Sequence, residues 1–146
     1  MAAALITAAT VAFLTAQGGS SDVLQGISAE DLAAQGITLE EPAQGSATAI
    51  TMDRATELAR GSRAGASVRE VRLVRLIDKH RSPATDKIAW AVNFDPQTVL
   101  DEPVLPYFPD RSPSSVPAQY QTQYSVAFVD PQTGEVFFSI SVTHGN

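Results

Sequence analysis

The sequence predicts an α+β fold in which one main helix packs on an antiparallel sheet of about four strands, preceded by a flexible N-terminal segment. Three observations predict this class. Residues 50–61 carry a capped helical pattern, residues 68–77 and 87–95 have strand character, and residues 124–142 form two strand-like runs around a tight turn. Strands joined by short connections pair antiparallel, and a helix is needed to cover their apolar face.

The helix is expected over residues 50–61. Thr51 is a suitable N-cap, Asp53 suits the positive end of the helix dipole, and Gly61 can end the helix. The apolar face is rich in small side chains, which would let the helix lie close to a sheet. Its members are Met52, Ala55, Leu58 and Ala59.

Two strands are expected after the helix. In residues 68–77 the arginines at spacing three would also fit a helix, but the β-branched content and the preceding Gly65 favour a strand. Residues 87–95 show a cleaner alternation of large apolar side chains with smaller ones, so they predict a strand in the core. The large side chains are Ile88, Trp90, Val92 and Phe94.

The closing hairpin, residues 124–142, is expected from its turn. Pro131 has its φ preset for a type I turn, and the Asp130 side chain can accept hydrogen bonds from turn N–H groups. Gly134 can adopt the left-handed conformation that a hairpin with a bulge requires. On both sides of this turn the apolar residues repeat every second position, which predicts two paired strands with one apolar face.

The chain divides into three parts. Residues 1–16 are uncharged and rich in alanine, shorter than the ~20 apolar residues of a membrane span, and resemble the apolar part of a signal peptide or an anchor. An ordinary N-terminal helix of a soluble protein is the alternative interpretation. Residues 17–49 are interpreted as a linker with one short helix, which the capping box of Ser28 and Asp31 starts and Gly36 ends. Residues 50–146 form the domain, interrupted by a loop at 96–117 that contains six prolines.

Composition excludes several kinds of function. The chain has no cysteine, which removes thiol catalysis and zinc sites with thiolate ligands, and its net charge of −6 makes a nucleic-acid partner a poor fit. Residues 54–81 are the exception, with eight basic and three acidic residues. This basic stretch suits an acidic partner or an anionic surface.

No catalytic or cofactor site is predicted. His80 with Asp78 and Asp86 lacks the ligand spacing of a metal site, and these residues are interpreted as loop residues in solvent. His144 is close to the end of the sequence, and neither a nucleophile motif nor a glycine-rich phosphate loop is present. We therefore expect a protein without catalytic, cofactor-binding or metal-binding residues.

Two groups of residues are candidates for binding a partner. The prolines of the 96–117 loop limit the ordering cost of binding, and Tyr107 and Phe108 within it could anchor a partner. Arg69, Arg72 and Arg75 form the second candidate patch, for which a solvated face is the alternative interpretation. A mobile insertion is the alternative interpretation of the loop.

The order of helix, two strands, long loop and closing hairpin resembles a PepSY domain over about residues 50–143. The family ends in a V-D-x-x-T-G-E-V turn between two strands, and this chain matches it. The matching residues are Val129, Asp130, Thr133, Gly134, Glu135 and Val136. The proline-rich loop is longer than the connection usual in the family.

The resemblance implies a small exported α+β module. Such domains occur in propeptides of secreted metallopeptidases, in cell-envelope proteins and as free-standing exported proteins, and inhibition of proteases has been proposed for them. We therefore expect a non-enzymatic exported or envelope-associated binding module that regulates an exported peptidase or binds another envelope protein, with the N-terminal segment as a contact to the membrane. A small-ligand-binding pocket protein of the cell envelope is the alternative, because a helix on a curved sheet can enclose a cavity.

Overall fold

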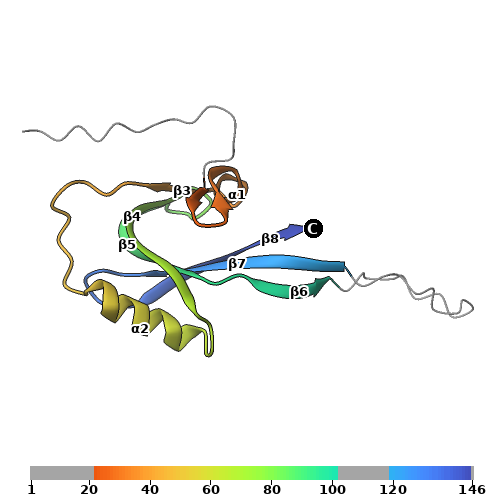
Figure 1. Cartoon of the computed structure of the whole chain (residues 1–146). Helices are drawn as coiled ribbons and strands as arrows, with labels where there is room; N and C mark the ends of the chain where they lie inside the picture. The colour runs from red at the N-terminus through yellow and green to blue at the C-terminus, as the bar shows by residue number, and fades with distance from the viewer. Residues whose placement is uncertain (1–21, 102–118, 146) are drawn as a thin grey trace, which may run out of the picture.

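The computed structural model describes residues 22–101 and 119–145, and these form a mostly β structure. Of the described residues 16% are helical and 52% lie in strands, which are arranged as a curled antiparallel sheet with two short helices (Figure 1). The predicted α+β class is therefore wrong. The predicted number of about four strands is wrong too, because the main sheet has six strands.

All strand pairs of the main sheet are antiparallel. The order is β3 (Ile37–Glu40), β4 (Val68–Asp78), β5 (Thr85–Phe94) and β7 (Gln119–Val129), and β7 also pairs with β6 (Gln97–Asp101) and β8 (Val136–Gly145). β5 pairs with the last residues of β7 and β6 with its first residues. Pro96 separates β5 from β6, because proline has no N–H to continue a ladder.

The sheet is buried on both faces, and this explains the run of apolar residues in β5. One face packs against β1 (Asp22–Leu24), β2 (Ile27–Ser28) and α1 (Ala29–Ala34), and the other against α2 (Met52–Ser62) (Figure 1). The first core contains Leu24, Ile27, Leu32, Val74, Leu76, Val126 and Phe128 among others. The second contains Ala55, Ala59, Val92, Phe94, Ala127 and Val129.

The segment interpreted as a linker contains more structure than one short helix. Between residues 22 and 40 it forms β1, β2, α1 and β3, and β3 is a strand of the main sheet. The expected capping box is confirmed, because Ser28 accepts from the Asp31 N–H and Asp31 accepts from the Ser28 N–H. Elements of two to six residues are too short to show a hydrophobic period in the sequence.

The expected helix is confirmed as α2. The Thr51 side chain accepts a hydrogen bond from the Arg54 N–H at 3.2 Å, and the helix continues one residue beyond Gly61. Ala55 and Ala59 are fully buried against the sheet, as small residues on a closely packed face should be. The Trp90 Nε1–H donates to the Ile50 carbonyl at 3.0 Å, so Trp90 fixes the start of the helix to β5.

The closing hairpin has the expected turn. One Asp130 carboxylate oxygen accepts from the N–H groups of Gln132 at 2.8 Å and Thr133 at 3.1 Å, and Gly134 has a φ of 78°. These backbone hydrogen bonds, with the nearby Lys87 ammonium, hold the pKa of Asp130 below its usual value. The register shifts between Phe128 and Val129, which confirms a bulge beside the turn.

The N-terminal segment 1–16 and most of the proline-rich loop lie outside the described residues. At the start of that loop, β6 forms before the second proline, Pro103. The expectation of no regular element across residues 96–117 is therefore wrong for residues 97–101. In the described ranges no helix combines the length and apolar character needed to cross a membrane.

Candidate functional site

The three arginines proposed as a binding patch are all exposed on β4, but they do not act together. Arg75 makes two hydrogen bonds to Asp86, at 2.8 and 2.7 Å, and a third to Glu40 at 3.1 Å. The hydrogen bonds from Arg75 hold the pKa of Asp86 below its usual value. Arg75 therefore joins β3, β4 and β5 at the surface and is occupied within the sheet.

Arg72 and Arg69 lie nearer the beginning of β4. Arg72 donates from Nη1 to the Val23 carbonyl at 2.7 Å, whereas the Arg69 side chain has no hydrogen bond or ion pair with the described part of the chain. Tyr107 and Phe108, the other predicted pair, lie outside the described residues. Of the predicted binding residues that the structure describes, Arg69 and Arg72 line the same hollow of the surface, and Arg75 does not.

A groove runs along the outer edge of β4, and we call it the β4 edge groove. It has a volume of about 490 Å³ and lies between the end of β3, the turn at residues 41–46 and β4. Pro42 explains its position. Because Pro42 has no N–H and follows directly on Glu41, β3 stops pairing at Glu40 and the chain turns away from β4.

The lining of the groove combines apolar side chains with charges at its edge. Leu39, Leu73, Val74 and Val23 supply apolar surface, while Glu40 and Arg72 supply opposite charges. A largely apolar concavity with a few polar groups is the usual form of a binding site in proteins. This groove was not predicted from the sequence, because residues 17–49 were interpreted as a linker.

One wall of the groove is held by hydrogen bonds that join β1 and the turn after it to the main sheet. Besides the Arg72 bond to Val23, the Gln25 N–H donates to a Glu70 carboxylate oxygen at 2.9 Å. The fully buried Asn93 donates from Nδ2 to the Gln25 carbonyl at 3.0 Å. These bonds join residues 45 to 68 positions apart, so only the folded chain defines this wall.

A second hollow of about 510 Å³ adjoins the groove and shares Val23 and Arg72 with it. Its remaining lining is more polar and includes Arg69, Glu70 and Tyr124. Together the two hollows follow the first half of β4. The surface along this strand is therefore the best candidate for a binding site in the described residues.

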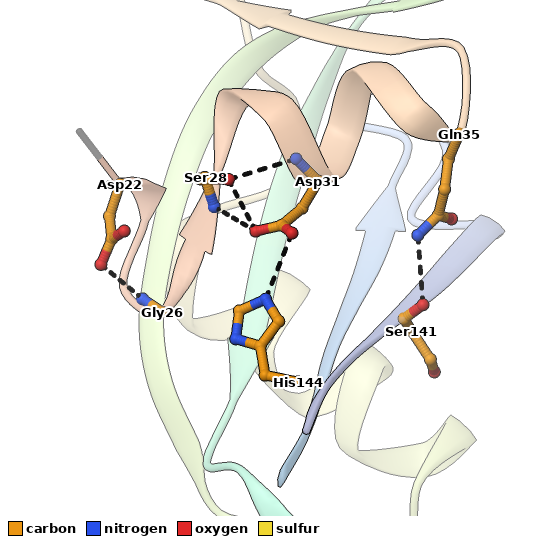
Figure 2. Close-up of polar contacts among 7 residues, drawn as sticks. All are labelled: Asp22, Gly26, Ser28, Asp31, Gln35, Ser141 and His144. Atoms are coloured by element: carbon orange, nitrogen blue, oxygen red, sulfur yellow. Dashed lines mark hydrogen bonds and ion pairs between the residues drawn. The ribbon is translucent and has the colours of Figure 1, made fainter. Parts of the chain in front are cut away.

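Ser28, Asp31 and His144 come together where α1 contacts β8, but they do not form a catalytic triad (Figure 2). Asp31 accepts from the Ser28 N–H at 2.8 Å and hydroxyl at 2.7 Å, and its other oxygen lies 3.2 Å from the His144 Nε2. A triad needs the imidazole between the hydroxyl and the carboxylate. Here the carboxylate lies between them, so the cluster holds α1 against β8.

The Asp31 carboxylate is expected to make the free energy of unfolding depend on pH in the acidic range. The hydrogen bonds from Ser28 and the neighbouring His144 lower its pKa below the usual 3.8. A lowered folded-state pKa adds stability above the unfolded pKa, and this stability is lost as the pH falls through the folded pKa. We expect Asp31→Asn to destabilise by about 1 kcal/mol at pH 7, and the difference to vanish in strong acid.

Chemical denaturation from pH 7 to pH 2 measures this effect. Glu30→Gln is the matched control, because Glu30 lies in the first turn of the same helix with an exposed side chain. It should change the free energy of unfolding little at any pH. A constant deficit of Asp31→Asn across the whole pH range would contradict the proposed charge effect.

The carboxylates near His80 already have partners. Asp78 accepts from the His80 N–H at 3.0 Å and pairs with Arg81 at 3.2 Å, while Asp86 pairs with Arg75. Within the two described ranges, no three or more His, Asp or Glu side chains are grouped so that they could hold a metal ion.

Fold and surface together define a mostly β protein with a curled antiparallel sheet, covered on both faces, and an open groove along one strand. Comparison of the chain with models of known families, with curated proteins and with solved structures finds no significant match.

Proposed function

We propose that this protein is a non-enzymatic binding module that takes a segment of a partner protein into the β4 edge groove. The groove carries the proposal, because it combines apolar surface with charges at its edge and its wall is fixed by long-range hydrogen bonds. The proposed partner is an exported peptidase, which the module would inhibit. This partner follows from the resemblance to PepSY domains, as does the proposed location outside the cytoplasm.

Inhibition of secreted metallopeptidases tests the proposal. The purified chain should lower hydrolysis of a fluorogenic peptide by at least one peptidase of a panel, in a saturable manner, while itself remaining uncleaved on a gel. Full activity of every peptidase at a large excess of the chain would contradict the proposal.

A matched pair of variants assigns the inhibition to the groove. Ala43 is an exposed residue of the turn that lines the groove, and Ala49 is exposed outside this lining. Ala43→Trp should fill the groove and weaken inhibition, whereas Ala49→Trp should leave inhibition unchanged. Equal effects of both variants would place the inhibitory surface elsewhere.

A small-ligand pocket protein is the second candidate function, and the size of the groove favours it. A volume of about 490 Å³ is within the range of ligand sites in proteins. A ligand at one hundred times its Kd would stabilise the folded chain by about 2.7 kcal/mol. A panel of small amphipathic molecules should then include one that raises the Tm, and Ala43→Trp should abolish the rise.

A further inference from the structure

We propose that the β4 edge groove binds its partner segment as an added antiparallel strand, which continues β3 along the outer edge of β4. The segment would be an extended peptide with a basic N-terminal end and an acidic C-terminal end. This inference rests on the proposed function, because it specifies how that groove recognises a protein. Three features of the groove carry it.

The first feature is the direction of the backbone groups of β4. The Lys79 N–H donates to the Gly36 carbonyl at 3.0 Å, in register with the pairing of Ile37 and Asp78. Hydrogen-bonded positions alternate in an antiparallel pair, so Ile77 and Arg75 also direct their backbone groups toward β3. The same alternation directs the N–H and C=O groups of Leu73 and Val71 to the outer edge, beyond the end of β3.

The second feature is that no described strand pairs with this part of the edge. β3 pairs with β4 only from Arg75 to Asp78, and β1 pairs with β2. An exposed row of strand N–H and C=O groups is a template for another strand. The edge from Val74 to Glu70 offers room for about five residues, at the rise of about 3.4 Å per residue of a strand.

The third feature is the charge at the two ends. A strand that continues β3 starts beside Glu41 and beside Glu40, whose carboxylate already contacts Arg75, and it ends beside Arg69 and Arg72. Arg69 has no partner in the described part of the chain, while the nearby Glu70 already accepts the Gln25 N–H. The acidic end therefore suits basic residues of an incoming peptide, and the other end suits acidic ones.

Side-chain alternation adds a preference along the peptide. The peptide residues that pair with Leu73 and Val71 would place their side chains on the face of the sheet that α2 covers. Val71 belongs to the apolar surface around the second core on that face. Apolar residues are expected at these two positions. Residues between them lie on the opposite face, beside Arg72 and Val23, where a small polar side chain fits.

The test uses the full chain and two capped synthetic peptides of the same composition. The first, Lys-Lys-Thr-Val-Thr-Val-Glu-Glu, has the expected charge order, and the second, Glu-Glu-Thr-Val-Thr-Val-Lys-Lys, has the reverse order. Amide hydrogen exchange is followed by NMR. The first peptide should slow the exchange of the Val71 and Leu73 amides, whereas those of Arg72 and Val74, which point to β5, should change little.

Variants test the same inference through affinity. Leu73→Pro removes one outward N–H and should weaken binding of the first peptide about threefold to tenfold. Arg69→Glu should weaken it by a similar factor, about threefold to tenfold, and should narrow the preference for the first peptide over the second. Arg60→Glu, on exposed α2 surface, is the control and should leave the affinity unchanged. Because Arg69 is exposed, the test stands even where Leu73→Pro does not fold.

Two results would overturn strand addition. One is protection of the Val71 and Leu73 amides already in the free chain, since the edge would then be filled. The other is peptidase inhibition that Arg69→Glu and Leu73→Pro leave unchanged, which would retain the proposed function and exclude this mode of binding. Failure of the unmodified chain to inhibit any peptidase counts instead against the proposed function.

Discussion

Leu32→Ala is expected to lower the free energy of unfolding by about 2–5 kcal/mol, the usual cost of removing a buried leucine from a core. Leu32 is 1% exposed and belongs to the first core, together with Leu24, Ile27 and residues of the main sheet. Its helix α1 has only six residues, which would be marginal in water without packing. The loss should therefore appear as global destabilisation.

Urea denaturation measures the effect, with Leu100→Ala as the control. Leu100 is 49% exposed on β6, so its truncation should cost less than about 1 kcal/mol. If residues 17–49 acted as a linker with a loosely attached helix, the two variants would cost the same. Equal midpoints would thus contradict the placement of α1 in the core.

Gly134→Val is expected to destabilise the protein by about 1–3 kcal/mol through the backbone alone, because Gly134 has a φ of 78°. A second cost comes from packing. A Cβ at this position would lie 2.8 Å from the Leu58 Cδ1 and 3.4 Å from the Ile50 Cδ1. The turn therefore has to be glycine both for its conformation and for the approach of α2.

Gly45→Val separates these two costs. Gly45 has a φ of 79°, but nothing lies within 4 Å of a Cβ placed there. Gly45→Val should therefore lose only the stability that the backbone conformation costs. The difference in Tm between Gly134→Val and Gly45→Val then measures the cost of the contact with α2. An unchanged Tm of Gly134→Val would show that the turn is not built as described.

The local elements of the domain could be predicted from the sequence because their signals are local. The Thr51 cap, the capping box of Ser28 and Asp31, and the Asp130 turn each depend on hydrogen bonds between residues two or three positions apart. Side-chain type and allowed φ and ψ are enough to recognise such signals.

The fold class could not be predicted in the same way. The structure is mostly β and not α+β because it contains four additional short strands, β1, β2, β3 and β6, of two to five residues each. Isolated short strands have no stability of their own, and they form because distant strands provide partners. The glycines and prolines around them resemble those of a linker, which is why the sequence favoured that interpretation.

The candidate site also combines features that local sequence indicates with features that depend on contacts between distant residues. Arg69 and Arg72 were predicted from their spacing, whereas the groove beside them depends on the end of β3 at Pro42 and on β1. Arg75 belonged to the same predicted patch, yet its position opposite Glu40 and beside β5 binds it to Asp86. Spacing along a strand does not tell which arginine has an acidic neighbour on the next strand.

Neighbouring residues are enough to place the helix caps, the closing turn and the long strands of this chain. The six-stranded sheet, the cover on both of its faces and the lack of a described partner along the first half of one β4 edge appear first in the folded chain. Strand pairing and burial depend on contacts between residues far apart in sequence, which no local pattern specifies.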